Sequence, residues 1–410
     1  MRRVVVTGLG IVSPVGCDPE TYFENLSNGV NGIGYITRFD TTDFRVRVAA
    51  EVKDFSILEY VEKSEARRMD LYTQYAVAAA DQAVKGSGIS GTVEPERFGV
   101  YVGSGIGGIL TLVAENEKLL NGGPRKVSPL FIPMMIGNIA AGTIAIRHNA
   151  QGPCLPVVTA CATSTHAIGE AFRAIKYGHA DAVIAGGAEA AITPLAVAGF
   201  TNCMALSLRN DPDDCSIPFD RRRDGFVMGE GAGILLLEEY EHAKKRNAVI
   251  YAEVAGYGNT CDAHHITAPH PEAKGAAEAI RLAVAESGYD GPNDRIYLNA
   301  HGTSTPLNDA AETIAVKKAY GDGAKKIHIS STKSMTEHML GAAGAAEAVA
   351  AVMALQNGIV PPTIGYKEPD EACDLNYTPN RCVRTELELS LSSSFGFGGH
   401  NGVLAFRKAN

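Results

Sequence analysis

The chain has 410 residues, 45% of them hydrophobic and 20% charged, an ordinary composition for a globular protein with a large core. A formal net charge of −9 at pH 7 argues against nucleic-acid binding, although a local basic patch could still meet an acidic partner. No apolar run approaches the ~20 residues of a membrane span, and the N-terminus lacks the apolar core of a signal peptide. The eight cysteines show neither zinc spacing nor a disulfide pattern, so we expect a reducing cytoplasm.

Short runs rich in β-branched residues alternate with helical patterns along the chain. The predicted strands are, in order, 2–10, 97–105, a short one at 157–159, 181–187, 233–239, 249–258, 295–302, 326–332, 387–395 and 401–408. The predicted helices are 64–88, 164–178, 271–288 and 344–358. This alternation is typical of an α/β fold in which helices cover mostly buried sheets.

Three segments recur in the same order in the second half of the chain. RRVVVTGLG resembles VIYAEVAGYG, RFGVYVGSG resembles RIYLNAHGTS, and the unit around Cys161 that ends in AIKYG resembles residues 326–358, which end in ALQNG. Self-similarity in register indicates a duplicated α/β unit. We therefore predict two halves, residues 1–250 and 251–410, with a site between them.

Cys161 lies where the predicted strand at 157–159 gives way to a helix. The unpaired N–H groups at a helix N-terminus favour a thiolate, and cysteine pKa values there fall to roughly 3.5–7.5 from about 8.5. A tight strand-to-helix corner also directs backbone N–H groups at an atom bonded to the sulfur. We expect a nucleophile with a lowered pKa; the alternative is an inert, buried thiol.

Two histidines follow strand ends in the second half. His301 closes RIYLNA and opens HGTSTP, while His338 lies in STKSMTEHMLGAAG, five residues after Lys333. Strand ends in such folds meet at one crevice, so both imidazoles are expected to face Cys161. A single histidine is more often structural, but two at equivalent strand ends opposite a cysteine indicate catalysis.

Residues 103–108, GSGIGG, follow a predicted strand and fit the G-x-G-x-x-G pattern of dinucleotide-binding sites. The segment after them offers no second strand ending in an acidic residue, which that type of site requires. Glycines here can equally let the backbone pass close to a substrate chain. A nicotinamide-dependent ketoreductase is therefore kept only as an alternative.

Four ordered motifs resemble those of the β-ketoacyl-[acyl-carrier-protein] synthases, condensing enzymes with the thiolase-type fold. They are VVTACATSTHA, HGTSTPLND, STKSMTEHMLGAAG and SSSFGFGGHN, and the resemblance spans essentially the whole chain. It implies five αβαβα layers built from two α/β halves. The KSM wording and the GSGIGG loop look closest to type II synthases, which elongate medium to long chains.

The resemblance implies a Cys-His-His acyltransferase of fatty-acid elongation. Cys161 would carry the acyl chain during a decarboxylative Claisen condensation with malonyl carrier protein. His301 and His338 would donate Nε2–H bonds to the oxygen that gains charge. Lys333, with Glu312, would support the histidines electrostatically, and the chemistry needs no metal or redox cofactor.

Other roles follow from the same resemblance. Backbone N–H groups of Cys161 and Phe397 would form an oxyanion hole, and Phe397 would act as a gate between flanking glycines. A homodimer and an acidic acyl carrier protein are the expected partners. The remaining implied residues are Thr303 and Thr305 for the pantetheine amides, Ile106 and Phe395 for the acyl pocket, Lys63, Arg67, Arg68, Arg125, Lys126 and Arg209 for carrier docking, and Asn299 and Glu347 for a possible monovalent ion.

One residue departs from the family's pattern. A glycine usually precedes the second histidine, as T-G-H, whereas this chain has Thr336-Glu337-His338. If the position needs a positive φ, Glu337 is strained there; otherwise its carboxylate crowds or charges the site and raises the pKa of the neighbouring histidine.

Related proteins with other activities are alternatives. A polyketide-type ketosynthase would share the motifs, and so would a non-catalytic partner subunit like the polyketide chain-length factors, which lacks the nucleophile that Cys161 supplies. A thiolase would need a second reactive cysteine, and no strand corner in the second half offers one. The preferred acyl length is not determined, because one side chain at the end of the pocket can change it.

Overall fold

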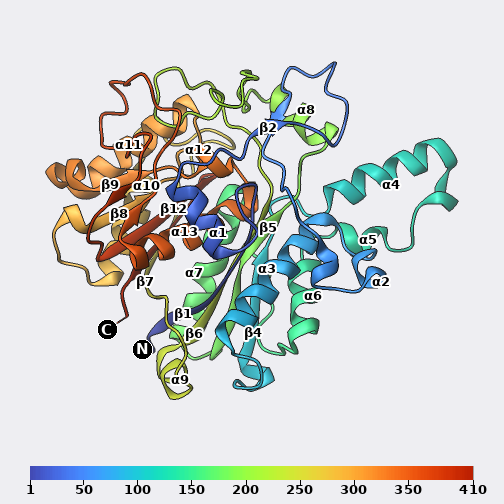
Figure 1. Ribbon diagram of the computed structural model, residues 1–410, viewed down its shortest axis with the longest axis horizontal. Helices are drawn as coiled ribbons and strands as arrows, with labels where there is room; N and C mark the ends of the chain where they lie inside the picture. Colours follow the sequence, from blue (N-terminus) through green and yellow to red (C-terminus); the bar gives the residue numbers. More distant parts are fainter. Residues whose placement is uncertain (410) are drawn as a thin grey trace.

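The structure, a computed structural model that describes residues 1–409, is organised around one large mixed sheet (Figure 1). Its strands, in chain order, are β1 (Val4–Val12), β4 (Phe98–Gly103), β5 (Ala182–Glu189), β6 (Gly231–Glu239), β7 (Ala252–Cys261), β8 (Ile296–Asn299), β9 (His328–Ser330), β12 (Leu389–Gly396) and β13 (His400–Arg407). Their order in the sheet is β4-β5-β6-β1-β7-β13-β12-β8-β9. Two small sheets pair β2 (Gly34–Tyr35) with β3 (Val48–Ala49), and β10 (Ile359–Val360) with β11 (Val383–Arg384).

The α-helices are α1 (Pro19–Ser27), α2 (Lys63–Ala66), α3 (Leu71–Ser87), α4 (Ile109–Gly122), α5 (Phe131–Met135), α6 (Ile139–His148), α7 (Thr163–Lys176), α8 (Pro194–Asn202), α9 (Tyr240–Lys245), α10 (Lys274–Ser287), α11 (Pro306–Tyr320), α12 (Lys333–Thr336) and α13 (Ala343–Asn357). No helix in residues 1–409 is both long and apolar enough to cross a bilayer.

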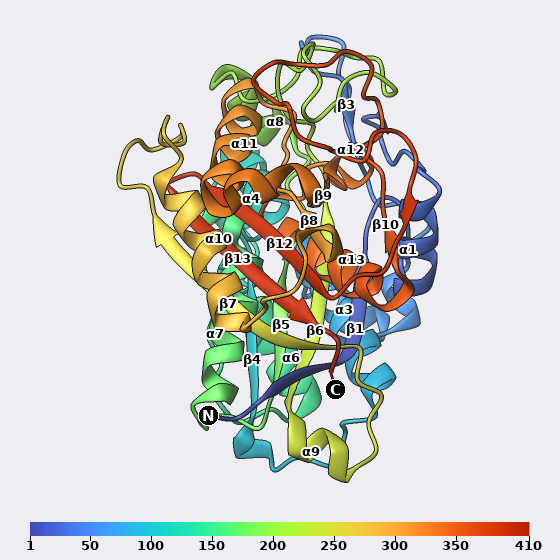
Figure 2. The same ribbon diagram turned by 90° about the vertical axis from the view of Figure 1, so that its left-hand side faces the viewer.

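The helices and the sheet form five layers, as predicted. The sheet supplies two of these layers, β4-β5-β6-β1 and β7-β13-β12-β8-β9. On the outside, α3 packs on β1 and β6, and α10 packs on β7 and β13. Two further helices lie between the parts of the sheet: α7 packs on β5 and β13, and α13 packs on β6 and β12. Figure 2 shows β12 and β13 (red) lying across β5 (green) and β6 (yellow-green). Helix α13 buries 12 of its 15 residues, mostly alanines, which lets both sheet parts approach it closely.

All nine strands of the large sheet were predicted, with ends that differ by a few residues. Two other predictions were wrong. The helix predicted over 64–88 is broken at Asp70, whose carboxylate caps α3 by accepting from the Tyr72 N–H (3.3 Å) and also binds the Thr111 N–H (2.8 Å). The strand predicted at 157–159 is absent, because the chain beside edge strand β4 forms only one bridge, between Val100 and Cys154.

Strands β1 and β7 each make the same close contact with an outer helix. A Cβ on Gly10 of β1 would lie 1.8 Å from the Ala79 carbonyl oxygen in α3. A Cβ on Gly258 of β7 would lie 1.9 Å from the Ala279 carbonyl oxygen in α10. Strand and helix approach this closely only because the strand residue is glycine.

Gly10→Ala and Gly258→Ala should therefore each lower the free energy of unfolding by about 3 kcal/mol, because backbone must shift to admit the methyl group. Gly34→Ala is the matched control, since no atom lies within 4 Å of a Cβ added there; we expect a change within about 0.5 kcal/mol. Urea denaturation of the three variants measures both effects. Equal small changes at all three positions would contradict the close packing.

Candidate active site

Cys161 lies on a tight turn that opens a central helix. A 3-10 turn, Ala160–Ala162, precedes α7, and Ala160 has a φ of 51°, in the left-handed region that alanine rarely adopts. The turn places Cys161 on the wall of a cavity of about 450 Å³. Backbone strain beside a nucleophilic side chain is typical of catalytic turns.

The thiol of Cys161 is less acidic than its place in the sequence predicted. Burial, the largest effect, raises its pKa to about 11, while the Lys333 charge and the N–H groups of Phe397 and Cys161 act in the opposite direction. The prediction of a lowered pKa was wrong because desolvation outweighs the helix end, and α7 begins only at Thr163. The two N–H groups nevertheless supply a pair of donors beside the sulfur.

His301 and His338 line the same cavity as Cys161. His301 follows β8, and His338 follows α12 and donates its backbone N–H to the Val227 carbonyl (3.0 Å). The two ring centroids are 5.4 Å apart and the ring planes are 87° to each other. Burial first, and the Lys333 charge second, hold both histidine pKa values well below their ordinary range. Both imidazoles are therefore neutral near pH 7.

Lys333 determines which nitrogen of His301 carries the proton. The lysine is 1% exposed, forms an ion pair with Glu347 of α13, and places Nζ 3.4 Å from Nδ1 of His301. Because the amine donates and Nδ1 accepts, the neutral ring carries its proton on Nε2. The sequence analysis named Glu347 only as a possible ligand of a monovalent ion and missed its pairing with Lys333. Burial raises the pKa of Glu347 to about 7, and the Lys333 charge opposes this rise.

Glu312 of α11 holds the backbone of the turn that bears His301. Its carboxylate accepts from the N–H groups of His301 and Gly302, both at 2.8 Å, and from the Ser393 hydroxyl at 2.8 Å. The carboxylate that pairs with Lys333 is thus Glu347, whereas Glu312 fixes the position of His301 through its main chain.

The loop after His301 carries the two predicted threonines. Thr303 and Thr305 line the cavity, and their hydroxyl groups are 3.0 Å apart. Ser304, between them, has a φ of 66° and accepts from the Ile217 N–H through its hydroxyl (3.0 Å). The loop is therefore held in a conformation in which both threonine side chains face the cavity.

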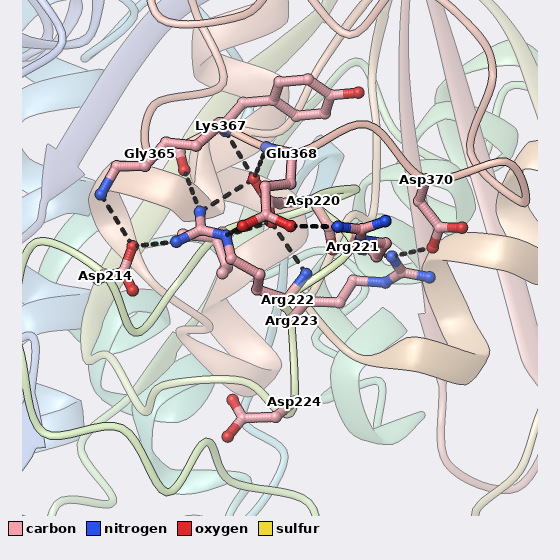
Figure 3. A network of polar contacts seen from close by, with 12 residues as sticks. Asp214, Asp220, Arg221, Arg222, Arg223, Asp224, Gly365, Lys367, Glu368 and Asp370 are labelled. Carbon is pink, nitrogen blue, oxygen red and sulfur yellow. Dashed lines mark hydrogen bonds and ion pairs between the residues drawn. The ribbon is translucent and has the colours of Figure 1, made fainter.

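Arg223, which binds the end of this loop, belongs to a network of charged side chains (Figure 3). Arg223 donates to the carbonyl of Pro306 (3.3 Å), to the carbonyl of Asp220 (2.9 Å) and to Asp370 (2.5 Å). The carboxylate of Asp220 in turn accepts from Arg222 at 2.8 Å. Sequence reasoning did not assign these residues, because ion pairs between distant segments leave no local pattern.

The GSGIGG loop also reaches the cavity. Ile106 lines it, as do Phe395 and Phe397, the other predicted pocket and gate residues. The loop amides are engaged by a residue that the sequence did not single out: Glu189 accepts from the N–H groups of Gly105 (2.9 Å) and Ile106 (3.2 Å). A dinucleotide phosphate would need such N–H groups free, so this loop does not fit the ketoreductase alternative.

The backbone of Glu337 has the positive φ that would make a non-glycine residue strained at this position. Its φ of 62° and ψ of −176° lie in a region that is essentially restricted to glycine. The side chain is 1% exposed, and neither carboxyl oxygen has a hydrogen-bond partner within residues 1–409. Burial raises its pKa well above the ordinary range. The residue is therefore strained and holds a buried carboxylic acid.

The predicted carrier-docking residues lie on separate elements. Arg209 is partly buried and forms an ion pair with Asp214 (2.7 Å). The exposed ones are Lys63, Arg67 and Arg68 on or just after α2, and Arg125 and Lys126 after α4.

Asn299 and Glu347 are the residues predicted to lie near a monovalent ion. The Asn299 amide lies 3.2 Å from the Thr332 hydroxyl, and one oxygen of Glu347 has no partner within the described chain. Over residues 1–409, no group of three or more His, Cys, Asp or Glu side chains could hold a metal ion. Binding of a monovalent ion near Asn299 and Glu347 stays a prediction.

Comparison with known proteins identifies the class. Residues 1–243 match the family described as "Beta-ketoacyl synthase, N-terminal domain", and residues 251–367 match its C-terminal domain. The chain is 51% identical to a 3-oxoacyl-[acyl-carrier-protein] synthase 2 of Synechocystis over 99% of this chain and 98% of that protein. It is 49% identical to the synthase 2 of Staphylococcus aureus, with the same coverage.

A solved structure gives the same answer for the fold. A type II polyketide ketosynthase, in complex with its acyl-carrier protein, superimposes with a TM-score of 0.91 at 35% identity over 100% of both chains. The fold and the sequence matches together define an acyltransferase of the ketosynthase type. The chain belongs to the β-ketoacyl synthase family.

The raised pKa of Cys161 predicts how the free thiol reacts. Since only the thiolate is a strong nucleophile, alkylation of Cys161 by iodoacetamide should increase about tenfold per pH unit from pH 7 to 9 without a plateau. Peptide mass mapping measures the rate, with the exposed Cys203, which lines the same cavity, as an internal reference. A plateau in the alkylation rate near pH 6–7 would contradict the raised pKa and support the thiolate predicted from the helix end.

The buried acid at Glu337 predicts a pH-dependent stability. An unfolded glutamate loses its proton near pH 4.3, whereas folded Glu337 keeps it to a much higher pH, so its contribution to stability falls as pH rises above about 4.3. Glu337→Gln removes the titration but keeps the strained backbone. The melting temperature of this variant, relative to the unmodified protein, should therefore increase steadily from pH 5 to pH 8.

Glu337→Gly also relieves the backbone strain, which costs about 1–3 kcal/mol. It should therefore be the most stable of the three proteins at pH 8, by differential scanning calorimetry. Parallel melting curves for the Gln variant and the unmodified protein would show that Glu337 does not titrate as described.

Proposed function

We propose that the chain elongates acyl chains by condensing malonyl carrier protein with an acyl group held on Cys161, as a 3-oxoacyl-[acyl-carrier-protein] synthase of fatty-acid synthesis. The observation that carries this proposal is the meeting of Cys161, His301 and His338 on one apolar-walled cavity, with both imidazoles neutral. Neutral rings donate hydrogen bonds without carrying a charge that would have to be desolvated.

The first stage is acyl transfer. The sulfur of Cys161 attacks the carbonyl carbon of the acyl-carrier thioester, a new carbon–sulfur bond forms, and the bond to the carrier's pantetheine sulfur breaks. The thiol proton of Cys161 passes to the departing pantetheine sulfur, so that the carrier leaves as its free thiol. The N–H groups of Cys161 and Phe397 hold the oxyanion of the intermediate. Deprotonation during attack removes the need for a resting thiolate.

The second stage is condensation. Malonyl carrier loses CO₂, and the electron pair of the broken carbon–carbon bond forms an enolate at the thioester. Nε2–H of His301, set by Lys333 on the opposite nitrogen, donates to that oxygen together with His338. The enolate carbon attacks the acyl group, the bond to the Cys161 sulfur breaks, and the sulfur takes up a proton. The product is two carbons longer.

The other predicted site residues take the following roles in this proposal. Thr303 and Thr305 bind the pantetheine arm, Ile106 and Phe395 border the acyl chain, and Phe397 between its glycines acts as the gate. Glu312 positions His301 through its backbone.

The proposal extends to the binding of the carrier protein and to the assembly of the enzyme. The acidic carrier docks on the exposed Lys63, Arg67, Arg68, Arg125 and Lys126, with Arg209 at the margin because its charge is already paired. A carrier-bound ketosynthase among the similar structures supports this partner class. The enzyme acts in the cytoplasm as a homodimer, and its two halves, 1–250 and 251–410, derive from one duplicated unit, which the repeated glycine contacts at Gly10 and Gly258 support.

The test is a condensation assay with acyl carriers of graded length and malonyl carrier, followed by the mass of the trapped enzyme. Cys161→Ala should abolish both the acyl adduct and the 3-oxoacyl product. His301→Asn should keep the adduct but lower condensation by at least about 100-fold, the usual contribution of one oxyanion donor. Cys154→Ala is the matched control, because this exposed cysteine lies outside the cavity, and it should behave like the unmodified enzyme. Full condensation by Cys161→Ala would refute the proposal.

A further inference from the structure

Three segments of the chain cross at Glu189, the last residue of β5. They are the end of β5 itself, the GSGIGG loop after β4, and the turn Leu340–Ala342 that follows His338. The side chain of Glu189 is fully buried, and it accounts for part of the electrostatic environment of Cys161. It has no role in the reaction as described above.

The carboxylate of Glu189 receives four hydrogen bonds from two of these segments. On the GSGIGG loop, the donors are the Ser104 hydroxyl (2.8 Å) and the N–H groups of Gly105 (2.9 Å) and Ile106 (3.2 Å). On the turn after His338, the donor is the Gly341 N–H at 3.0 Å. Burial raises the pKa of this carboxyl, and the four donors oppose the rise. One side chain thus ties the two segments together.

Glycines leave no room for another link at this crossing. A Cβ on Gly341 would lie 2.4 Å from the Gly105 nitrogen, and a Cβ on Gly105 would lie 2.8 Å from the carboxylate. A Cβ on Gly187, two residues before Glu189, would lie 2.7 Å from the Gly341 carbonyl oxygen. The backbones are therefore in direct contact, and the distance between them depends on the carboxylate that both of them bind.

The two tied segments each present an apolar side chain to the cavity. Ile106 is directly bound to Glu189 through its N–H, and Leu340 immediately precedes the bound Gly341; both line the cavity with Cys161. Leu340 has a φ of 47°, so its position depends on contacts that hold the turn in this conformation. Ile106 and Leu340 are therefore the apolar wall residues that lie at or next to the N–H groups bound by Glu189.

We propose that Glu189 is a positioning residue that sets the spacing between Ile106 and Leu340 and thereby the acyl chains that Cys161 accepts. The inference rests on the proposed function and adds to it a determinant of substrate choice. A pocket wall discriminates between chains by fit only when its backbone is fixed, because a wall that can shift lets several lengths bind with similar energy.

The chemistry of the side chain makes this claim specific. An ionised carboxylate is an acceptor at all its positions, and it can satisfy four donors at once. Glutamine has nearly the same shape but turns one acceptor into an N–H₂ donor, which would face an N–H or hydroxyl donor of the crossing. Glu189→Gln therefore loosens the junction without removing volume.

The experiment measures acyl-adduct formation on Cys161 by intact mass, over time, for saturated acyl carriers of graded length. In Glu189→Gln, the ratio of the fastest to the slowest loading rate should fall about tenfold, as the lengths become less well distinguished. Glu238→Gln is the matched control: Glu238 is an equally buried carboxylate of the same sheet, bound to Thr7 and Arg246. Its length profile should keep the unmodified shape even if stability falls.

Ser104→Ala provides a second variant that removes one donor and keeps the carboxylate, so it is expected to fold even if Glu189→Gln does not. Its profile should flatten in the same direction by about threefold, as expected for loss of one hydrogen bond. A uniform decrease at every length, with unchanged ratios, would overturn the inference and leave Glu189 a purely structural residue. Absence of any adduct on the unmodified enzyme would overturn the proposed function as well.

Discussion

Two central helices, α7 and α13, are covered on both sides by the sheet, and this constraint determines where the site can lie. Most residues of both helices are buried, so each helix begins at the ends of the strands around it. Both begin in the same way, with a 3-10 turn whose first residue has a left-handed φ, Ala160 in one case and Leu340 in the other. The turns bring Cys161 and the segment after His338 together at one cavity.

The same burial determines the protonation of the site. Removing water disfavours charge on every group, so it lowers the histidine pKa values and raises those of the Cys161 thiol and the Glu337 carboxyl. Burial also raises the pKa of Glu347 to about 7, although the contact with Lys333 opposes that rise. A site with neutral donors suits a reaction in which charge develops briefly on a thioester oxygen, since the protein's dipoles are already oriented for it.

Much of this could be read from the sequence, for identifiable reasons. Strands buried on both faces leave continuous apolar runs, and His301 could be named because it follows one of them. Cys161 could be named from its motif, although no strand precedes it. The depth of burial leaves no local signal, so the acidity of Cys161 was predicted in the wrong direction. Glu189 and the pairing of Lys333 with Glu347 also escaped prediction, because each depends on segments that are more than ten residues apart and meet only in the folded chain.

The Arg223 network illustrates the same limit on the outside of the site. Its arginines are adjacent in sequence, yet one binds Pro306 and Asp370 while its neighbour Arg222 binds Asp220. The sequence assigned no role to this run, whereas in the fold Arg223 binds the end of the threonine-bearing loop.

The weak acidity of Cys161 also bears on covalent probes of the enzyme. Cys203 is exposed on the wall of the same cavity, so a small electrophile meets this more accessible thiol before it reaches Cys161. Selective labelling of Cys161 must therefore come from an aliphatic tail that occupies the space beside Ile106 and holds the warhead at the sulfur. Molecular fit, rather than intrinsic thiol reactivity, is the property to optimise in such a compound.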